Sequence, residues 1–192
     1  MSELELNNII IISGPSGAGE DSVIEGLRAY TTVNRVITTT TRNMREGEAQ
    51  GEPYYFIAHD EFEAKKANGE MAEWAQQYNG NLYGVTNDEL ERVNNLEGVG
   101  VWKIEYQGVI NMKEKFPGLK AIMLMAESPE VLEQRIRDRS DVTDEFIAER
   151  MEYTKEWMKH KDVYDYVIVN EQGQLDAAIA EAVEILKKEN LI

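Results

Sequence analysis

Residues 14–22 read GPSGAGEDS and directly follow an apolar run, Ile9–Ile12. The run predicts a buried strand, and a helical pattern begins at Asp21. Between them, the frame G-x-x-x-x-G from Gly14 to Gly19 lets backbone N–H groups turn inward, and the helix N-terminus adds partial positive charge. This stretch therefore predicts a phosphate-binding loop between a strand and a helix.

The loop lacks the two residues that usually complete such a motif. A phosphate-binding loop of this kind continues with Lys, which reaches the β- and γ-phosphates, and with Ser or Thr, which holds Mg²⁺. Glu20 and Asp21 occupy these two places. Two carboxylates repel a polyphosphate, so any function assigned to the loop must account for them.

Composition limits the class of protein. The chain has 192 residues, which suits one domain with room for a lid or an inserted subdomain. It has no cysteine, which excludes disulfides and thiolate metal sites and is typical of a reducing cytosol. No apolar run approaches the roughly 20 residues that span a bilayer, and residues 1–8 do not resemble a signal peptide. We expect a cytoplasmic protein with no membrane partner.

The formal net charge of −16 argues against a nucleic-acid partner, because that function needs a broad basic face. It does not exclude nucleotides, since a small anion responds to local charge. High net charge also keeps a protein soluble without any further role.

Strand and helix patterns alternate at both ends of the chain. The strands are expected at Ile9–Ser13, Val33–Thr39, Val99–Ile104, Ala121–Met125 and Tyr166–Val169. The helices are expected at Asp21–Tyr30, Gln107–Lys115, from Pro129 after a Ser128 N-cap to Arg139, Thr143–Lys159 and Gln174–Asn190. This alternation predicts an α/β fold with a parallel sheet and helices on both faces.

The middle of the chain, roughly Arg35 to Asn95, breaks the alternation. Extended segments are expected at Tyr54–Ile57, Glu70–Gln77 and Leu82–Val85, with short helices at Glu61–Ala67 and from an Asn87 cap to about Asn95. Asp60 and Glu63 have the spacing of a capping box. We interpret this region as an inserted module of mixed strands and helices.

Basic, aromatic and acidic residues form clusters that suit an anionic ligand. Arg42 and Arg45 follow a run of threonines, and an Arg fork binds phosphate bidentately while hydroxyls add donors. A tyrosine hydroxyl such as that of Tyr54 can bind phosphate, and a carboxylate such as Glu73 can accept from the N1–H and N2 amine of guanine. A charged loop after a strand, a half-buried aromatic and a surface acid explain the same residues without a ligand.

Arg135 and Arg139 share one helix face at i, i+4, where like charges repel. Such a pair is either a solvated face or a place where a phosphoryl group docks between two cations.

Taken together, these motifs resemble guanylate kinase over nearly the whole chain. The matching stretches are GPSGAG at Gly14–Gly19, Thr40-Thr41-Arg42 with Arg45, Gly47-Glu48, Gly51, Tyr54, Glu73-Trp74-Ala75, Gly80-Asn81, Tyr83-Gly84, Gln107-Gly108, Arg135, Arg139, Arg150 and Val167-Ile168-Val169-Asn170. Several spaced motifs in the right order are a far more specific signal than a glycine loop alone.

The resemblance implies a kinase that transfers a phosphoryl group from ATP to GMP with Mg²⁺. It implies a P-loop NTPase-type core (1–34, 96–126 and 160–192), a GMP-binding module (35–95) and a helical lid (about 127–159). The GMP site would comprise Thr38, Arg42, Arg45, Tyr54, Glu73, Tyr83, Thr86 and Glu105. The ATP site would comprise Gly14, Pro15, Ser16, Gly17, Ala18, Gly19, Glu20, Asp21, Ser22, Arg135, Arg139 and Asn170. The catalytic residues would be Arg42, Arg135, Arg139 and Arg150, and to these we add Lys103, which departs from the family pattern, as a candidate replacement for the loop lysine.

The chain departs from the family pattern at two places. The family has Gly-Lys-Ser-Thr where this chain has Gly19-Glu20-Asp21-Ser22, and an acid where this chain has Lys103. One hypothesis is a charge swap, in which Lys103 pairs with Glu20 or meets the β- and γ-phosphates while Asp21 holds Mg²⁺. The other is coincidence in a decaying active site.

Two functions therefore remain open from the sequence. The first is a guanylate kinase with a rearranged loop, which the lid arginines favour. The second is a catalytically inactive guanylate-kinase-like module that binds GMP or a phosphopeptide, which the two loop carboxylates favour. We expect the small-molecule nucleotides GMP and ATP as partners, and a monomer or a homodimer.

Overall fold

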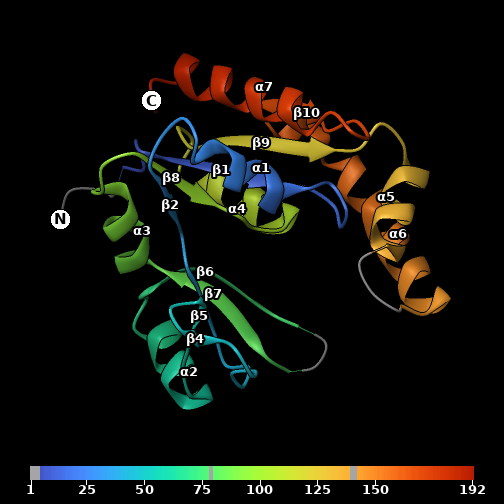
Figure 1. Cartoon of the computed structure of the whole chain (residues 1–192). Helices are drawn as coiled ribbons and strands as arrows, with labels where there is room; N and C mark the ends of the chain where they lie inside the picture. Colours follow the sequence, from blue (N-terminus) through green and yellow to red (C-terminus); the bar gives the residue numbers. More distant parts are fainter. Residues whose placement is uncertain (1–4, 78–79, 139–141) are drawn as a thin grey trace.

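The computed structural model describes residues 5–77, 80–138 and 142–192 and shows an α/β fold built on two sheets (Figure 1). The first is a five-stranded sheet of order β10-β9-β1-β8-β2, in which neighbouring strands run parallel. Its strands are β1 (Ile9–Ser13), β2 (Val33–Arg35), β8 (Val99–Trp102), β9 (Lys120–Met125) and β10 (Tyr166–Val169). The expected parallel core is confirmed.

Helices cover both faces of this sheet, as expected. One face carries α1 (Glu20–Leu27) and α7 (Leu175–Lys188), and the other carries α3 (Asn87–Asn94) and α4 (Tyr106–Lys115). Since a strand directs alternate side chains to opposite faces, Ile10 and Ile12 pack towards α1, whereas Ile9 and Ile11 pack towards α4. A strand covered on both faces is apolar throughout, which is why β1 begins with four isoleucines.

The second sheet has the strand order β4-β5-β3-β7-β6 and lies below the first in Figure 1. Its strands are β3 (Thr38–Thr40), β4 (Ala49–Gln50), β5 (Pro53–Phe56), β6 (Met71–Gln76) and β7 (Leu82–Thr86), with α2 (His59–Ala67) packed beside them. Phe62 of α2, Met71 and Leu82 form a small core of their own. Parallel and antiparallel strand pairs are combined in this sheet, whereas its role as an inserted module stays a prediction. The residue limits of the module and the lid stay predictions.

The chain passes from the first sheet to the second between Arg35 and Thr38. We expected a single strand from Val33 to Thr39, but the structure divides it into β2 and β3. Val36 N–H still donates to the core carbonyl of Val101 at 2.9 Å, whereas Ile37 N–H donates to the Glu89 carboxylate. β-Branched residues suit both sheets, so the sequence pattern contains no sign of the break.

Two helices follow β9 at the right of Figure 1, namely α5 (Pro129–Arg137) and α6 (Asp144–Lys159), and the short 3₁₀ helix η1 (Lys161–Val163) leads into β10. Ser128 caps α5 through its hydroxyl group, as expected, and Thr143, which was expected to begin the next helix, caps α6 in the same way.

Several predicted helix ends were wrong. The helix after the glycine loop ends at Leu27 rather than Tyr30, and α5 ends at Arg137 rather than Arg139, which lies outside the described residues. Asp60 does not cap α2, because that helix begins at His59, two residues before the expected Glu61, and Ala58 is at the N-cap. Asn87 does not cap α3 either, since the hydroxyl of the preceding Thr86 accepts from Glu89 N–H at 3.2 Å.

Among the residues that the structure describes, no helix is both long and apolar enough to cross a membrane.

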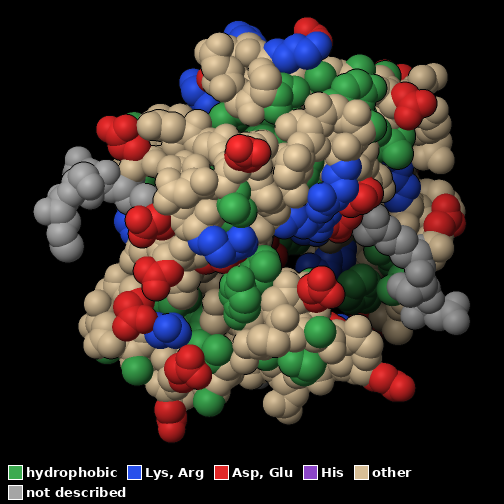
Figure 2. All heavy atoms as spheres, turned by 60° about the vertical axis from the view of Figure 1, so that its left-hand side comes forward, with side chains coloured by type: hydrophobic (Ala, Val, Ile, Leu, Met, Phe, Trp, Pro, Cys, Tyr) green, Lys and Arg blue, Asp and Glu red, His purple; other side chains and the backbone are tan. Residues whose placement is uncertain are grey.

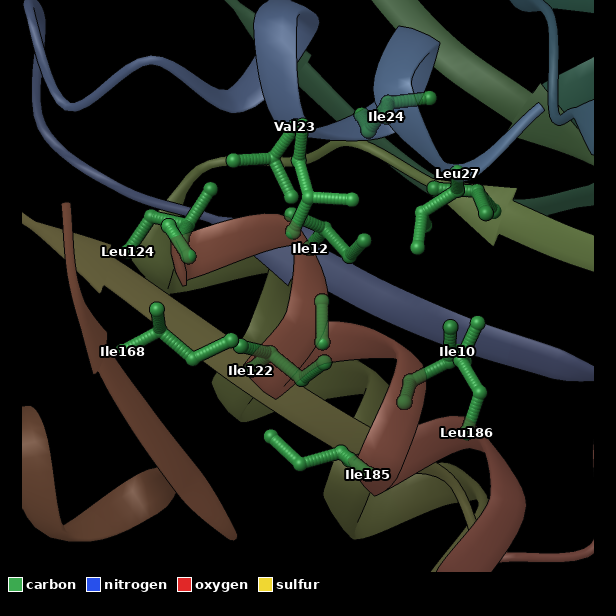
Figure 3. Close-up of a cluster of buried hydrophobic side chains, with 14 of the residues drawn as sticks. Ile10, Ile12, Val23, Ile24, Leu27, Ile122, Leu124, Ile168, Ile185 and Leu186 are labelled. Atoms are coloured by element: carbon green, nitrogen blue, oxygen red, sulfur yellow. The ribbon is translucent and has the colours of Figure 1, made fainter. Parts of the chain in front are cut away.

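The core beneath the glycine loop depends on side chains from α1. Figure 3 shows Val23, Ile24 and Leu27 of this helix pointing towards Ile10 and Ile12. We expect Leu27→Ala to lower the free energy of unfolding by about 2–5 kcal/mol, because it removes buried methyl groups and leaves a cavity. Urea denaturation measures this loss.

The matched control is Leu96→Ala, since Leu96 is 39% exposed. It should change the free energy of unfolding by no more than about 0.5 kcal/mol. Equal losses in the two variants would show that α1 does not anchor the core.

Candidate active site

The glycine loop runs from β1 to α1, with Gly19 at the N-cap of the helix. Gly19 has φ 97°, in the left-handed region, and a Cβ atom there would lie 2.4 Å from Asn170 Nδ2. Asn170 Nδ2 in turn donates to the carbonyl of Ala18 at 2.9 Å. The structure therefore brings Asn170 against the loop, and only a glycine suits position 19.

Arg135 of α5 lies over the same loop. Its guanidinium donates to the carbonyls of Gly17 at 3.3 Å and Asn170 at 2.9 Å, and to Gln172 Oε1 at 3.1 Å. A cavity of about 270 Å³ lies beside these groups and is lined by Gly17, Gly19, Ser22, Arg135, Asp138, Asn170, Glu171, Gly173 and Leu175. Sequence reasoning missed Gln172, which holds Arg135 in place and follows Asn170 by two residues.

The other predicted lid arginines are not joined to the loop in the same way. Arg150 lies over the ring of Phe146, one turn earlier in α6, with its guanidinium carbon 5.0 Å from the ring centroid. Arg139 lies outside the described residues. Among the predicted lid arginines that the structure describes, Arg135 therefore contacts the glycine loop and Arg150 contacts Phe146 instead.

The loop carboxylate at position 21 is bound by two cations. Lys103 Nζ donates to Asp21 Oδ2 at 2.8 Å, and Arg35 Nη1 donates to Asp21 Oδ1 at 2.9 Å. Partial burial would raise the pKa of the Asp21 carboxyl, but Lys103 and Arg35 outweigh it and hold that pKa below its usual range. Lys103 is therefore bound to the first turn of α1 through Asp21, whereas its predicted pairing with Glu20 stays a prediction.

Glu20 and Asp21 form the first turn of α1. Acidic residues are favourable at this end of a helix, because they interact with its partial positive charge. This explains why the fold accepts two carboxylates at the loop.

Asp21 was also the predicted Mg²⁺ ligand. A carboxylate is a suitable donor for a hard cation, but both Asp21 oxygens already accept hydrogen bonds from positive groups, which oppose the approach of a divalent ion. No group of three or more His, Asp or Glu side chains is arranged to hold a metal within the described ranges. The neighbourhood of Asp21 does not fit a resident metal ion, and a metal role for this residue stays a prediction.

Arg42 is held in place at the end of β3. Its two terminal nitrogens donate to the carboxylate of Glu48 at 3.0 and 2.8 Å, and its guanidinium lies over the rings of Tyr54 and Phe56 at 5.4 and 5.3 Å. The bond to Glu48 raises the pKa of Arg42, and the same bond lowers the pKa of Glu48. Sequence reasoning matched Glu48 to the family but gave it no role in the site.

Strand order gathers the other residues of this cluster. Because β3 lies between β5 and β7, Thr38 stands opposite Tyr54, and the rings of Tyr54 and Tyr83 approach to 5.9 Å between centroids. Arg45 joins through its backbone, since its N–H donates to Glu48 at 2.8 Å. The predicted phosphate-binding residues therefore lie together, arranged around Arg42.

Glu73 and Glu105 approach from different parts of the fold. Glu73 lies on β6 and Glu105 at the N-cap of α4, where it accepts from the hydroxyl of Tyr153 on α6 at 2.6 Å. Burial, together with the nearby charge of Glu105, raises the pKa of Glu73 to about 7. Burial and the bond to Glu105 raise the pKa of Tyr153, which keeps its hydroxyl a donor.

Thr86, predicted to read guanine, is the N-cap of α3. Its hydroxyl oxygen accepts from Glu89 N–H, so the hydroxyl hydrogen is the part that stays available to a ligand.

A cavity of about 660 Å³ joins the two sheets. Its lining residues are Asp21, Ile24, Arg28, Val33, Asn34, Arg35, Val36, Ile37, Thr38, Gly51, Glu52, Pro53, Tyr54, Arg92, Val101 and Lys103. Figure 2 shows the molecule hollowed between its upper and lower parts, with Lys and Arg side chains gathered at the upper rim. A chain of net charge −16 therefore concentrates cations along this hollow.

A glycine loop between β1 and α1 of a parallel sheet, with arginines on both sides of a hollow, defines a P-loop nucleotide-binding protein. The family model for guanylate kinase matches residues 6–189. The chain belongs to the guanylate kinase family.

Individual relatives agree with the family model. The guanylate kinase of Histophilus somni (strain 129Pt) is 36% identical over 188 residues, which cover 96% of this chain and 89% of that protein. The guanylate kinase of Haemophilus ducreyi is 38% identical over 190 residues, covering 97% and 90%. The crystal structure of guanylate kinase from Anaplasma phagocytophilum superposes with a TM-score of 0.68 at 30% identity, covering 94% of this chain and 85% of that one.

The raised pKa of Glu73 predicts how stability varies with pH. The folded state binds this proton more tightly than the unfolded chain does, so the contribution of Glu73 to stability is lost as pH rises through about 7. We expect Glu73→Gln to flatten the fall in the free energy of unfolding between pH 5 and pH 8. Urea denaturation at a series of pH values measures this slope.

Glu184→Gln is the matched control, because Glu184 is an exposed carboxylate on α7. It should keep the wild-type slope. Parallel curves for the wild type and Glu73→Gln would contradict the burial argument.

Proposed function

We propose that this chain is a guanylate kinase that transfers the γ-phosphoryl group of ATP to the phosphate of GMP, giving ADP and GDP. One observation carries the proposal. The cavity of about 660 Å³ touches Asp21 and Lys103, beside the donor loop, and also Thr38 and Tyr54, within the predicted acceptor site. Donor and acceptor phosphates held on these two sides would meet inside it.

Catalysis in this class depends on positioning and on neutralising charge. Arg42, with Tyr54 and Tyr83 beside it, would bind the GMP phosphate, and Arg45 would add a second guanidinium. Glu73 and Thr86 would read the guanine, since a carboxylate accepts from N1–H and the N2 amine. These donors favour the ionised form of Glu73, so GMP binding would release its proton near neutral pH.

On the donor side, the backbone of Gly14–Gly19 would bind the ATP phosphates, with Arg135 and Asn170 at the loop. Mg²⁺ enters with ATP and would neutralise charge on the phosphate oxygens. Lys103 would supply the positive charge that a P-loop lysine usually supplies, because it reaches Asp21 at the first turn of α1. A cytoplasmic location and a monomeric or homodimeric state stay predictions.

A coupled assay that measures ADP formation with GMP, ATP and Mg²⁺ tests the proposal. We expect turnover that depends on both nucleotides, and isothermal titration calorimetry should detect binding of GMP and of a non-hydrolysable ATP analogue. GMP binding without analogue binding or turnover would contradict the kinase and leave a binding module.

Lys103→Ala tests the rearranged loop. Since Lys103 would neutralise phosphate charge that no loop lysine can reach, we expect kcat to fall by about 10²–10³-fold, the usual effect of losing one such donor. Steady-state kinetics with saturating GMP measures it. Lys187→Ala, an exposed lysine on α7, serves as the control and should retain wild-type kcat. Full activity in Lys103→Ala would reject the hypothesis.

A further inference from the structure

Arg35 is a cation near the loop that the sequence did not single out. It ends β2, and its register partner is Val101 in the neighbouring parallel strand β8. Lys103 follows β8 by one residue. Because the carboxyl ends of parallel strands lie at one edge of a sheet, Arg35 and Lys103 emerge side by side at the first turn of α1, where Asp21 binds both.

Stability does not explain this arrangement. The side chains of Arg35, Lys103 and Asp21 are 39%, 45% and 53% exposed, and ion pairs this accessible contribute about 0–1 kcal/mol. Removal of one of them should therefore leave the fold intact.

Charge and position both suit an anion. The three groups are two cations and one carboxylate, so the cluster has a net positive charge. All three line the cavity that also reaches Thr38 and Tyr54. A planar guanidinium and a compact ammonium side by side match the oxygens of a phosphoryl group, since the first binds two oxygens and the second acts as a point charge.

We propose that Arg35 and Lys103 act together on the phosphoryl group in transfer, and that Asp21 is a positioning residue that holds the two cations rather than a metal ligand. This proposal rests on the kinase function proposed above. An oxygen of the GMP phosphate forms a bond to the γ-phosphorus, and the bond from that phosphorus to the β–γ bridging oxygen breaks. The electron pair leaves with ADP, and a dianionic acceptor phosphate has no proton to lose.

In this step the negative charge lies on the equatorial oxygens of the transferred group. Arg35 and Lys103 require no rearrangement to meet it, because Asp21 already fixes both side chains. The Asp21 carboxylate would then strengthen phosphate binding, because it adds one negative charge but orders two cations.

Kinetics of Arg35→Ala, Arg35→Lys, Asp21→Asn and the control Lys187→Ala test the proposal, with thermal unfolding as a check that each variant is folded. We expect Arg35→Ala to lower kcat by about 10²–10³-fold with little change in KM for GMP, and Arg35→Lys to restore part of the loss. Lys187→Ala should match the wild type. Wild-type kcat in Arg35→Ala would overturn the proposal.

Asp21→Asn separates positioning from metal binding. A positioning role predicts a lower kcat with an unchanged Mg²⁺ concentration for half-maximal activity. It also predicts that Asp21→Asn adds little to the loss in Arg35→Ala, because both changes disable the same pair. A raised Mg²⁺ requirement would show that Asp21 is a metal ligand and would overturn this part of the inference.

Binding distinguishes failure of the inference from failure of the kinase function. If the wild type shows no turnover, calorimetry with Mg²⁺ and a non-hydrolysable ATP analogue decides. Binding that Arg35→Ala weakens at least tenfold would support the cation pair as a phosphate site in a protein that is not a kinase. Binding that Arg35→Ala leaves unchanged, or no binding by the wild type, would overturn the inference.

Discussion

A buried carboxylate helps to hold the two sheets together. Glu89 of α3 is 4% exposed and accepts from Ile37 N–H, in the segment that passes between the sheets, at 2.8 Å. The same carboxylate binds two nitrogens of Arg92 at 2.8 Å each and the Tyr55 hydroxyl of β5 at 3.4 Å. A buried charge of this kind is stable only when its partners are in place, so α3, the connecting segment and β5 are fixed together.

Much of the fold could be predicted because a strand that is buried on both faces of a parallel sheet appears in the sequence as a continuous apolar run. Ile9–Ser13 and Tyr166–Val169 are strands with the predicted limits, since each is an apolar run between polar residues. The division of Val33–Thr39 was not predictable, because β2 and β3 both accept β-branched residues. Helix caps failed where two neighbouring residues could each serve, as with Thr86 and Asn87.

The site was predictable where it depends on spacing along the chain and unpredictable where it depends on sheet order. Arg42 and Tyr54 were grouped through the spaced motifs that resemble guanylate kinase, and the pairing of β3 with β5 brings them together. Arg35 reads as an ordinary strand residue, and its place beside Lys103 follows from β2 pairing with β8, which lies some sixty residues further along. The raised pKa of Glu73 likewise depends on the packing of distant segments, which buries Glu73 and brings the charge of Glu105 near it.

The bidentate ion pair between Arg42 and Glu48 affects how an anion can bind to this arginine. In the free protein the guanidinium is already neutralised, with both of its terminal nitrogens engaged by one carboxylate. An incoming phosphate must therefore exchange with Glu48 or share its hydrogen bonds, instead of filling an empty site. If Arg42 binds the GMP phosphate as proposed, this exchange would favour a dianionic phosphate monoester over a singly charged anion, because the dianion interacts more strongly with the guanidinium.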